Sequence, residues 1–336
     1  MPTTIMPRLG SILILSMLSL VACDAMQVPE GPDALPQAID FRTGPEGPWP
    51  PPGGGLNTAW LGDTPLMRIL PPGYLHILRG LDVRATQIQV QIAGQYHTVT
   101  SVSAVEGTLI LETAVGTHKG AELVGSRWWL DQGHTEYITI TEVAEGGQAP
   151  GYQLAYKAKD GEGMGTVPIC EPDIDGDHWA YLVGDVYVDV DDATITQDTG
   201  ALLVACSSGA LGKAITWGFA PWVHDDEPLP GVGEPPPLDL PLYQTGVRTV
   251  RADYCGDGEA HTEDGTRIQV RNDLIGLAFD SSQQSTEAVF GPDGALCLSS
   301  PRDPGAVVDC ALPTCPPFAW TLMTAHYHAW TKLAPP

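Results

Sequence analysis

The clearest structural signal in the chain is the hexapeptide Gln-Ile-Gln-Val-Gln-Ile at residues 87–92. Polar and apolar side chains alternate in it, and a period of two buries one face of a β-strand while the other face meets water. The same alternation recurs at residues 138–141, 152–156 and 186–190. Turn-forming residues separate these segments at short intervals, as in antiparallel meanders and sandwiches. The sequence therefore predicts a mostly β protein made of antiparallel sandwich-like or barrel-like units.

Two further local elements are predicted in the second half of the chain. Ala210, Ala214 and Trp217 fall on one face of a single short helix, and the serines at 207–208 precede it as candidate N-cap residues. The segment 288–297 contains two apolar runs around a Gly-Pro-Asp-Gly turn. This pattern is typical of a β-hairpin.

The N-terminus has the pattern of a secretory signal. Arg8 precedes the apolar run 9–20, and small residues lead from there to Cys23. A cationic start, about a dozen apolar residues and small residues before the cleavage site are typical of a signal peptide. The cysteine at that site resembles a bacterial lipobox, in which Cys23 receives lipid and becomes the first mature residue. We therefore expect residues 1–22 to be a lipoprotein signal peptide.

This signal predicts an extracytoplasmic protein that is anchored to a membrane through lipid on Cys23, in the periplasm or on the cell surface. The alternatives are an ordinary signal peptide that is cleaved elsewhere and an uncleaved anchor. The apolar run is shorter than the roughly 20 residues that span a bilayer, which disfavours the uncleaved anchor.

The charge of the chain limits its partners. It contains 16 basic and 41 acidic residues, for a net charge of −25. Such a surface repels nucleic acid phosphates and anionic lipid head groups. We therefore expect no nucleic-acid partner, and we expect an envelope protein or a glycan as the partner beyond the lipid anchor. The acidity favours solubility, with attraction of divalent cations as the alternative interpretation.

Composition divides the chain into several parts. After the signal peptide, residues 23–55 are rich in proline and glycine and should form an extended tether without a core. We expect an N-terminal β unit at residues 56–169 and a disulfide-stabilised C-terminal unit at residues 170–315. A proline-rich linker is expected at residues 224–241, and a tail at residues 316–336.

The cysteines predict disulfides. Of the seven cysteines, Cys23 belongs to the signal, and an even number remain, at Cys170, Cys206, Cys255, Cys297, Cys310 and Cys315. An even number in an oxidising compartment indicates that all of them pair, with the connectivity left open. No two cysteines have the Cys-x-x-Cys spacing that would favour a zinc cluster.

Three segments of the C-terminal half carry a resemblance to a known family. They are Val-Arg-Ala-Asp-Tyr-Cys-Gly-Asp-Gly at residues 250–258, Ala-Cys-Ser-Ser-Gly-Ala-Leu-Gly-Lys at residues 205–213 and Phe-Gly-Pro-Asp-Gly-Ala-Leu-Cys at residues 290–297. In their sequence order, 205–213, then 250–258, then 290–297, they resemble the ADYC domain family, an uncharacterised and mainly myxobacterial group of envelope lipoproteins. The resemblance covers roughly residues 170–315 and implies no activity, because the family has no assigned chemistry.

The resemblance also bears on the disulfides. Relatives have cysteines at the positions of Ala214 and Gly246, and the absence of both here keeps the cysteine count even. This implies that the two cysteines pair in relatives and tie the short helix to a strand that enters the Ala252–Cys255 tetrapeptide. It further implies a pairing for this chain: Cys170 with Cys206, Cys255 with Cys297, and Cys310 with Cys315.

The residues around Cys255 are the candidates for catalysis, namely Asp253, Asp257, His261 and Asp264. Carboxylates beside a histidine can supply a general acid and a general base, or hold a metal. The alternative is a glycine-rich turn in which the aspartates accept hydrogen bonds from backbone amides.

A second acidic segment resembles the start of a calcium loop. Asp173, Asp175 and Asp177 stand at alternate positions, and hard oxygen ligands suit calcium. An EF-hand is excluded, because its sixth position here is His178 and its twelfth is Gly184. Another kind of calcium loop and a plain acidic turn remain as alternatives.

We expect a cell-envelope lipoprotein that acts as a non-catalytic binding or structural module, since no known catalytic motif accompanies the anchor and the cysteines. One alternative is an extracytoplasmic, hydrolase-like enzyme that uses Asp253, His261 and Asp264. The other is a calcium-stabilised adhesion module, and no cofactor except this calcium is expected. Trp128 and Trp129 are expected in the core, with an exposed platform for sugars or a partner protein as the alternative.

Overall fold

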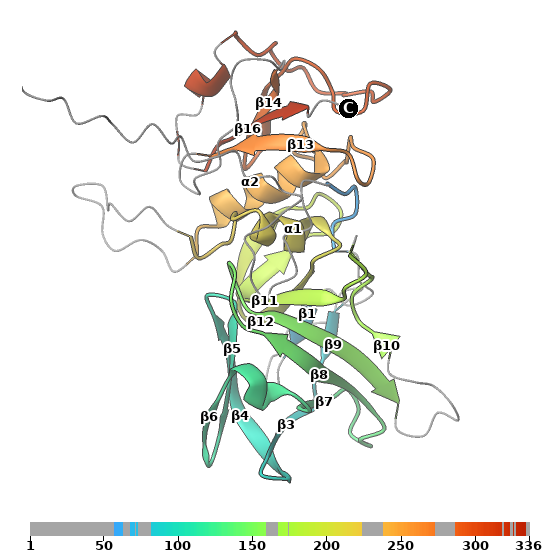
Figure 1. The fold of residues 1–336 in the computed structure, drawn as a ribbon, viewed down its shortest axis with the longest axis vertical. Helices are drawn as coiled ribbons and strands as arrows, with labels where there is room; N and C mark the ends of the chain where they lie inside the picture. Colours follow the sequence, from blue (N-terminus) through green and yellow to red (C-terminus); the bar gives the residue numbers. More distant parts are fainter. Residues whose placement is uncertain are drawn as a thin grey trace, which may run out of the picture. The chain divides into compact units, whose positions relative to one another are not determined.

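The computed structural model describes residues 57–62, 68–70, 72, 82–158, 167–173, 175–223, 238–272, 286–317, 319–322, 325 and 327–333 (Figure 1). All of them belong to one unit of the chain, residues 36–336. The expected signal peptide, Cys23, the tether at 23–55 and positions 224–237 of the expected linker lie outside the described residues.

The described residues form two β-sheets, and the larger one contains twelve strands. Eleven of these lie in the order β2-β1-β12-β11-β9-β8-β7-β3-β4-β5-β6, while β10 pairs with β9, and all pairs are antiparallel except β1–β2. The strands are β1 (Arg68–Leu70), β2 (Asp82–Arg84), β3 (Gln87–Ile92), β4 (Gln95–Val105), β5 (Thr108–Thr113), β6 (Gly116–His118), β7 (Arg127–Trp129), β8 (Glu136–Ala144), β9 (Gly151–Ala158), β10 (Val167–Pro168), β11 (Trp179–Val188) and β12 (Ile195–Cys206), with a 3₁₀ turn at Gly120–Leu123.

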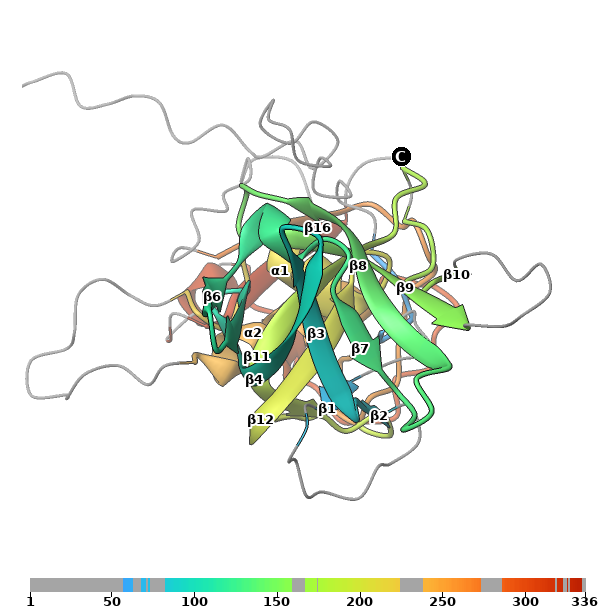
Figure 2. The same ribbon diagram turned by 90° about the horizontal axis from the view of Figure 1, so that it is seen from below.

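The larger sheet is rolled, so that β4 packs against β11 and β12 (Figure 2). The approach is close at Gly184 on β11, where an added Cβ would lie 2.7 Å from the carbonyl oxygen of Ala104 on β4. The alternation that predicted strands is confirmed, because Ile88 and Val90 are fully buried whereas Gln91 is exposed. The sheet ends at β2 and β6, so it is sandwich-like and does not close into a barrel.

The inside of the roll is filled by buried apolar side chains from nine of its strands. Trp128 and Tyr152 are the largest of them, and both are almost fully buried. The hydroxyl of Tyr152 accepts a hydrogen bond from the amide of Leu109 (2.8 Å), so its polar end is also satisfied. Trp129 is also buried, with 5% of its surface exposed, but it lies on the opposite face of the sheet, against His134 and Tyr137.

Two helices lie between the larger sheet and the smaller sheet (Figure 1). They are α1 (Ala210–Thr216) and α2 (Leu240–Arg251), and the smaller sheet has the order β13 (Ile268–Arg271), β16 (Ala329–Leu333), β14 (Thr286–Gly291) and β15 (Gly294–Leu298), with a second 3₁₀ turn at Ala319–Leu322. One apolar cluster continues from β11 and β12 through both helices to β13, β14 and β16. Neither helix is long and apolar enough to cross a membrane, nor is any other helix within the described ranges.

The predicted helix and hairpin are both present. The helix is α1, although its N-cap residue is Gly209, and the expected cap Ser207 instead donates a hydrogen bond to Asp173 (2.8 Å). The hairpin consists of β14 and β15, which pair on either side of the turn at residues 291–294.

Helix α2 was not predicted, because its start lies within the proline-rich segment 224–241, which was interpreted as a linker. Asp239 is its N-cap residue, and the Asp239 carboxylate accepts from the amide of Leu242 (2.9 Å). Pro241 lies in the first turn, where a helix tolerates proline because no intrahelical partner exists for its amide. The prediction that a strand leads into the tetrapeptide is therefore wrong, because helix α2 leads into it.

The larger sheet continues across residue 170, the expected boundary between two units. Strand β11 pairs with β9, and β12 pairs with β1. Strands from both sides of residue 170 therefore belong to one sheet. The two helices and the smaller sheet then follow in the sequence.

Helices α1 and α2 pack closely where relatives are inferred to have a disulfide. A Cβ added to Gly246 on α2 would lie 3.1 Å from the Cβ of Ala214 on α1, and it would collide with Phe219. Cysteines at these two positions are therefore near enough to pair, given the usual Cβ separation of about 3.5–4.5 Å. Such a bond would join two helices rather than a helix and a strand.

The replacement Gly246→Ala is expected to lower the free energy of unfolding by about 1–2 kcal/mol, because the overpacking at Phe219 exceeds the gain in helix propensity. Gly291→Ala is the matched control, since its added Cβ would be in ordinary contact with His328 at 3.5 Å. Urea denaturation of both variants measures the effect. A Gly246→Ala variant as stable as the wild type would contradict the close packing of the helices.

Candidate functional site

The tetrapeptide Ala252–Cys255 begins at the residue that ends α2. Ala252 adopts the left-handed conformation (φ 53°) of a helix C-cap, and its amide approaches the carbonyl oxygens of Arg248 and Thr249. Ala252 is fully buried among apolar residues of the central cluster. The left-handed backbone of Ala252 thus ends the helix, and its small side chain fits into the apolar interior.

Asp253 is fully buried and caps the following turn. Its two carboxylate oxygens accept hydrogen bonds from the amides of Gly256 (2.9 Å) and Gly258 (3.0 Å), and Oδ2 also pairs with Nη1 of Arg248. Gly256 has a positive φ, and an added Cβ would collide with the carbonyl oxygen of Asp293 in the β14–β15 turn. Glycine is therefore needed where the two turns meet.

Tyr254 connects the tetrapeptide to a second buried ion pair. Its hydroxyl donates to Oε1 of Glu287 (2.9 Å) and accepts from the amide of Arg302 (2.7 Å). The side chains of Arg302 and Glu287 form an ion pair (2.9 Å) that is wholly shielded from water. Burial and the nearby Glu287 carboxylate raise the pKa of Tyr254 above its ordinary value.

The six cysteines considered above form three disulfides. The pairing that the resemblance implied is correct for one of the three. Cys170 pairs with Cys206 as expected. The pairs Cys255–Cys297 and Cys310–Cys315 are wrong, because Cys255 pairs with Cys310 and Cys297 pairs with Cys315. Cys297 packs with Cys315 in a small apolar cluster beneath Trp330, separate from the central cluster that contains Tyr254.

His261 lies beside Tyr254 and joins two backbone segments. Its Nδ1 lies 3.2 Å from the carbonyl oxygen of Ala252, and its Nε2 lies 3.2 Å from the carbonyl oxygen of Val307. The ring is 5% exposed and stacks at an angle against the Tyr254 ring. His261 therefore fastens the loop around Val307 to the tetrapeptide.

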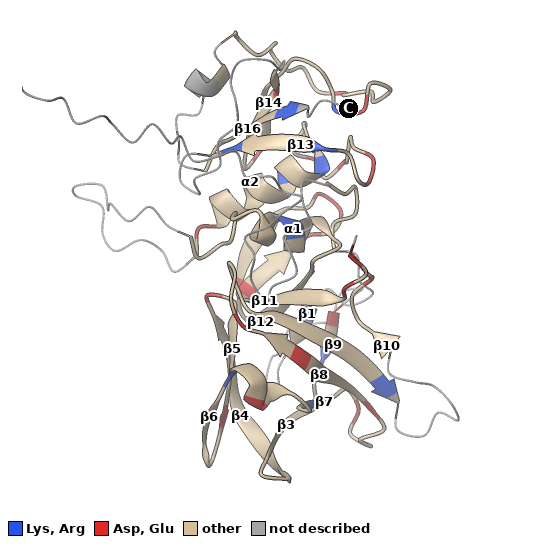
Figure 3. Cartoon of the chain, in the orientation of Figure 1, with Lys and Arg blue, Asp and Glu red and all other residues tan. Residues whose placement is uncertain are grey.

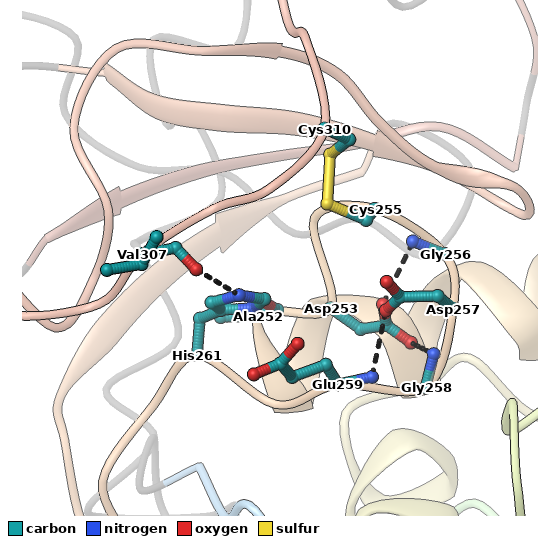
Figure 4. The surroundings of a disulfide bond; sticks show 10 residues. All are labelled: Ala252, Asp253, Cys255, Gly256, Asp257, Gly258, Glu259, His261, Val307 and Cys310. Atoms are coloured by element: carbon teal, nitrogen blue, oxygen red, sulfur yellow. Dashed lines mark hydrogen bonds between the residues drawn. A yellow bond between two sulfur atoms is a disulfide. The ribbon is translucent and has the colours of Figure 1, made fainter.

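The four candidate catalytic residues do not converge. The exposed Asp257 accepts from the amide of Glu259 (3.0 Å), on the other side of the turn from His261 (Figure 4). Asp264 accepts from the hydroxyl of Thr58 (2.8 Å) and the amide of Ala59 (2.9 Å). Each candidate thus stabilises a different part of the backbone. The three aspartates accept hydrogen bonds from backbone amides, as in the alternative interpretation of a glycine-rich turn.

The Asp264 contacts fix the first described segment, residues 57–62, to the tetrapeptide region. Nε of Arg251 donates to the carbonyl oxygen of Ala59 (3.0 Å), and the amide of Gly265 donates to the carbonyl oxygen of Asn57 (3.0 Å). These contacts join parts of the chain that are about 200 residues apart, which sequence patterns do not reveal.

The candidate calcium residues form a turn beside α1. Asp173 Oδ1 accepts from the amides of Asp175 (3.0 Å) and Asp177 (3.0 Å), while Oδ2 accepts from the hydroxyl of Ser207 (2.8 Å). Desolvation, together with the charges of Asp173 and Asp177, raises the pKa of the Asp175 carboxyl. Within the part of the chain that the structure describes, no three His, Cys, Asp or Glu side chains are grouped so that they could hold a metal.

A comparison with family models places these elements in a known group. The model of the ADYC domain matches residues 120–304, which is more than half of the chain. The chain belongs to the ADYC domain family. The match begins earlier than the resemblance suggested and includes β7, β8 and β9, which lie in the same sheet as β11 and β12. No curated protein and no solved structure matched the chain.

Sequence reasoning missed the buried partners within the ADYC domain. Arg248, Glu287 and Arg302 are each at most 4% exposed, and they supply the counter-charges and hydrogen bonds of Asp253 and Tyr254. A charged residue beside apolar ones could have pointed to Arg248 and Glu287 without naming their partners, and Arg302, in a polar and proline-rich stretch, carries no such signal.

The replacement Asp253→Asn is expected to lower the free energy of unfolding by about 3–5 kcal/mol, because it leaves the Arg248 guanidinium buried without a counter-charge. Asp257→Asn is the matched control four residues away, and it should change the stability by less than about 0.5 kcal/mol. Urea denaturation of the two variants provides the measurement. Equal stabilities would show that the Asp253–Arg248 pair is not a structural element.

The buried tyrosines predict a loss of stability in alkali. Burial raises the pKa of Tyr243 as well as that of Tyr254, so the folded chain keeps protons that the unfolded chain releases near pH 10. Each such group should lower the free energy of unfolding by about 1.4 kcal/mol per pH unit above about pH 10. Urea denaturation at about pH 8, 9, 10 and 11 should give a flat region followed by a decline. A stability that stays constant up to about pH 11 would be the contrary result.

Proposed function

We propose that this chain is a lipoprotein of the bacterial cell envelope, whose folded part is a non-catalytic binding or structural module. The disulfides Cys170–Cys206, Cys255–Cys310 and Cys297–Cys315 fit an oxidising, extracytoplasmic compartment. The lipid anchor rests on the sequence around Cys23, and the proline- and glycine-rich segment 23–55 would separate it from the folded part.

The observation that carries the non-catalytic role is that the polar groups of the family motif are engaged in the interior. Both oxygens of Asp253 and the hydroxyl of Tyr254 have backbone or ion-pair partners, and Cys255 is in a disulfide. Both ring nitrogens of His261 face carbonyl oxygens. A general acid or base must be within reach of a substrate proton, and these groups are committed elsewhere.

The anchor is tested by the replacement Cys23→Ser in the bacterium that makes the protein. We expect the wild type to incorporate a labelled fatty-acid analogue and to sediment with membranes, whereas the Cys23→Ser variant incorporates none. Ser19→Ala, which changes a nearby position in the apolar run and keeps Cys23, is the control and should behave as the wild type. A labelled Cys23→Ser variant would contradict lipidation at this residue.

The non-catalytic role is tested by complementation of a gene deletion. Asp264→Asn removes one carboxylate of the hydrolase alternative, and the double variant Asp257→Asn/Glu259→Gln removes the two exposed carboxylates of the turn. If the protein is a binding or structural module, each variant should restore the wild-type phenotype in proportion to the amount of folded protein. A variant that folds in normal amounts and restores nothing would favour the hydrolase.

A further inference from the structure

A cluster of aromatic rings around one arginine lies on the water-facing side of the larger sheet. We call it the Arg127 cluster, and it consists of Tyr96, Arg127, Trp129, His134 and Tyr137. The guanidinium carbon of Arg127 is 4.1 Å from the centre of the Tyr96 ring, 5.5 Å from that of Tyr137 and 5.8 Å from that of Trp129. The His134 ring stacks on Trp129 at 4.7 Å, and the Tyr137 ring is also 4.7 Å from Trp129.

The β-ladder places these side chains together. Trp129 on β7 is opposite Tyr137 on β8, and Arg127 on β7 is opposite Gln89 on β3. Successive side chains of a strand point to opposite faces, so this face is the reverse of the one on which Trp128 is buried. Rigid strands thus hold the cluster, and Trp129 Nε1 is fixed by a hydrogen bond to Oε1 of Gln89 (3.1 Å).

Arg127 has no carboxylate partner among the residues that the structure describes. The Asp131 carboxylate, which follows β7 in the sequence, accepts from the amides of Thr135 (2.8 Å) and Glu136 (3.1 Å). The aromatic rings therefore position the Arg127 guanidinium, and no carboxylate among the described residues accepts hydrogen bonds from it. A planar guanidinium held in this way matches the two oxygens of a carboxylate.

The charge of this region is unusual for the chain. Although the net charge is −25, the cluster contains Arg127, and Lys157 on β9 lies opposite Tyr137 in the ladder. Figure 3 shows blue segments at β7 and at the end of β9, and red segments in several loops. Because the carboxylates of Asp131 and Glu136 also adjoin the cluster in the sequence, the attraction for an anion comes from the Arg127 guanidinium itself.

The remaining groups on this face suit a sugar ring. Tyr96 is 36% exposed, and the exposed Gln91 lies opposite it in the ladder. An aromatic face offers apolar contact to the C–H face of a ring, and an amide both donates and accepts hydrogen bonds with hydroxyls. A few polar groups among aromatic side chains are typical of small-molecule sites.

We propose that the Arg127 cluster binds a uronic-acid residue of an acidic polysaccharide. The carboxylate of the sugar pairs with the Arg127 guanidinium, and the ring lies against Tyr96 within reach of Gln91. This inference rests on the proposed role as a binding module and adds the class of ligand to it.

The test uses the mature chain from residue 23 and a defined oligogalacturonate as the probe, with binding measured by calorimetry. We expect the wild type to bind the probe, and a neutral oligosaccharide of equal length not to bind. Arg127→Gln should weaken binding by about ten- to hundredfold, the range for a hydrogen-bonded charge. Arg127→Lys should weaken it less, because the charge remains while the planar pairing is lost. The exposed Arg267 provides the matched control, and Arg267→Gln should bind as the wild type does.

Absence of oligogalacturonate binding, or equal binding by Arg127→Gln, would overturn the sugar site. Stronger Arg127-dependent binding to vesicles containing phosphatidylglycerol would also overturn it, by assigning the arginine to a lipid phosphate. Neither result touches the proposed function, which the Cys23 labelling and the complementation test independently. Binding followed by cleavage of the probe would support the site and contradict the non-catalytic role.

Discussion

The buried charge of Arg248 is the interaction on which the arrangement of the two sheets depends. Its guanidinium pairs with Asp253 and also donates to the carbonyl oxygens of Asp192 (2.6 Å) and Pro292 (3.4 Å). Asp192 belongs to the connection between β11 and β12, and Pro292 belongs to the turn between β14 and β15. One side chain of α2 therefore joins both sheets. Removal of any partner is unfavourable, because an unpaired buried charge strongly destabilises a protein.

The four residues of the tetrapeptide Ala252–Cys255 each stabilise the region where α2 meets the two sheets. Ala252 ends α2 in a buried position, Asp253 neutralises Arg248, Tyr254 reaches the Glu287–Arg302 pair, and Cys255 holds the loop that contains Cys310. Every one of these roles concerns folding. A binding surface of this chain is therefore to be sought away from the motif, and aromatic rings surround Arg127 there, which has no carboxylate partner among the described residues.

The sequence predicted those parts of the structure that local patterns control. The alternation at residues 87–92 gave a strand with Ile88 and Val90 inside, and the turn at 291–294 gave a hairpin. Helix α2 was missed because proline in a first turn looks like proline in a linker. The roles of Asp253 and His261 depend on partners such as Arg248 and Val307, which only the folded chain brings near. The pairing of the last four cysteines failed for the same reason, because only the folded chain brings Cys310 to Cys255 and Cys315 to Cys297 on β15.

The two C-terminal disulfides interleave along the chain, because Cys297 lies between Cys255 and Cys310, and Cys310 lies between Cys297 and Cys315. A single cut in the backbone anywhere from residue 255 to residue 315 consequently leaves both fragments covalently joined. Val307, which is 74% exposed, lies within that interval. A protease that cuts the chain once there would release no fragment until a reductant opened the disulfides. Cleavage of the backbone in this interval and release of a fragment therefore require two different reactions, proteolysis and disulfide reduction.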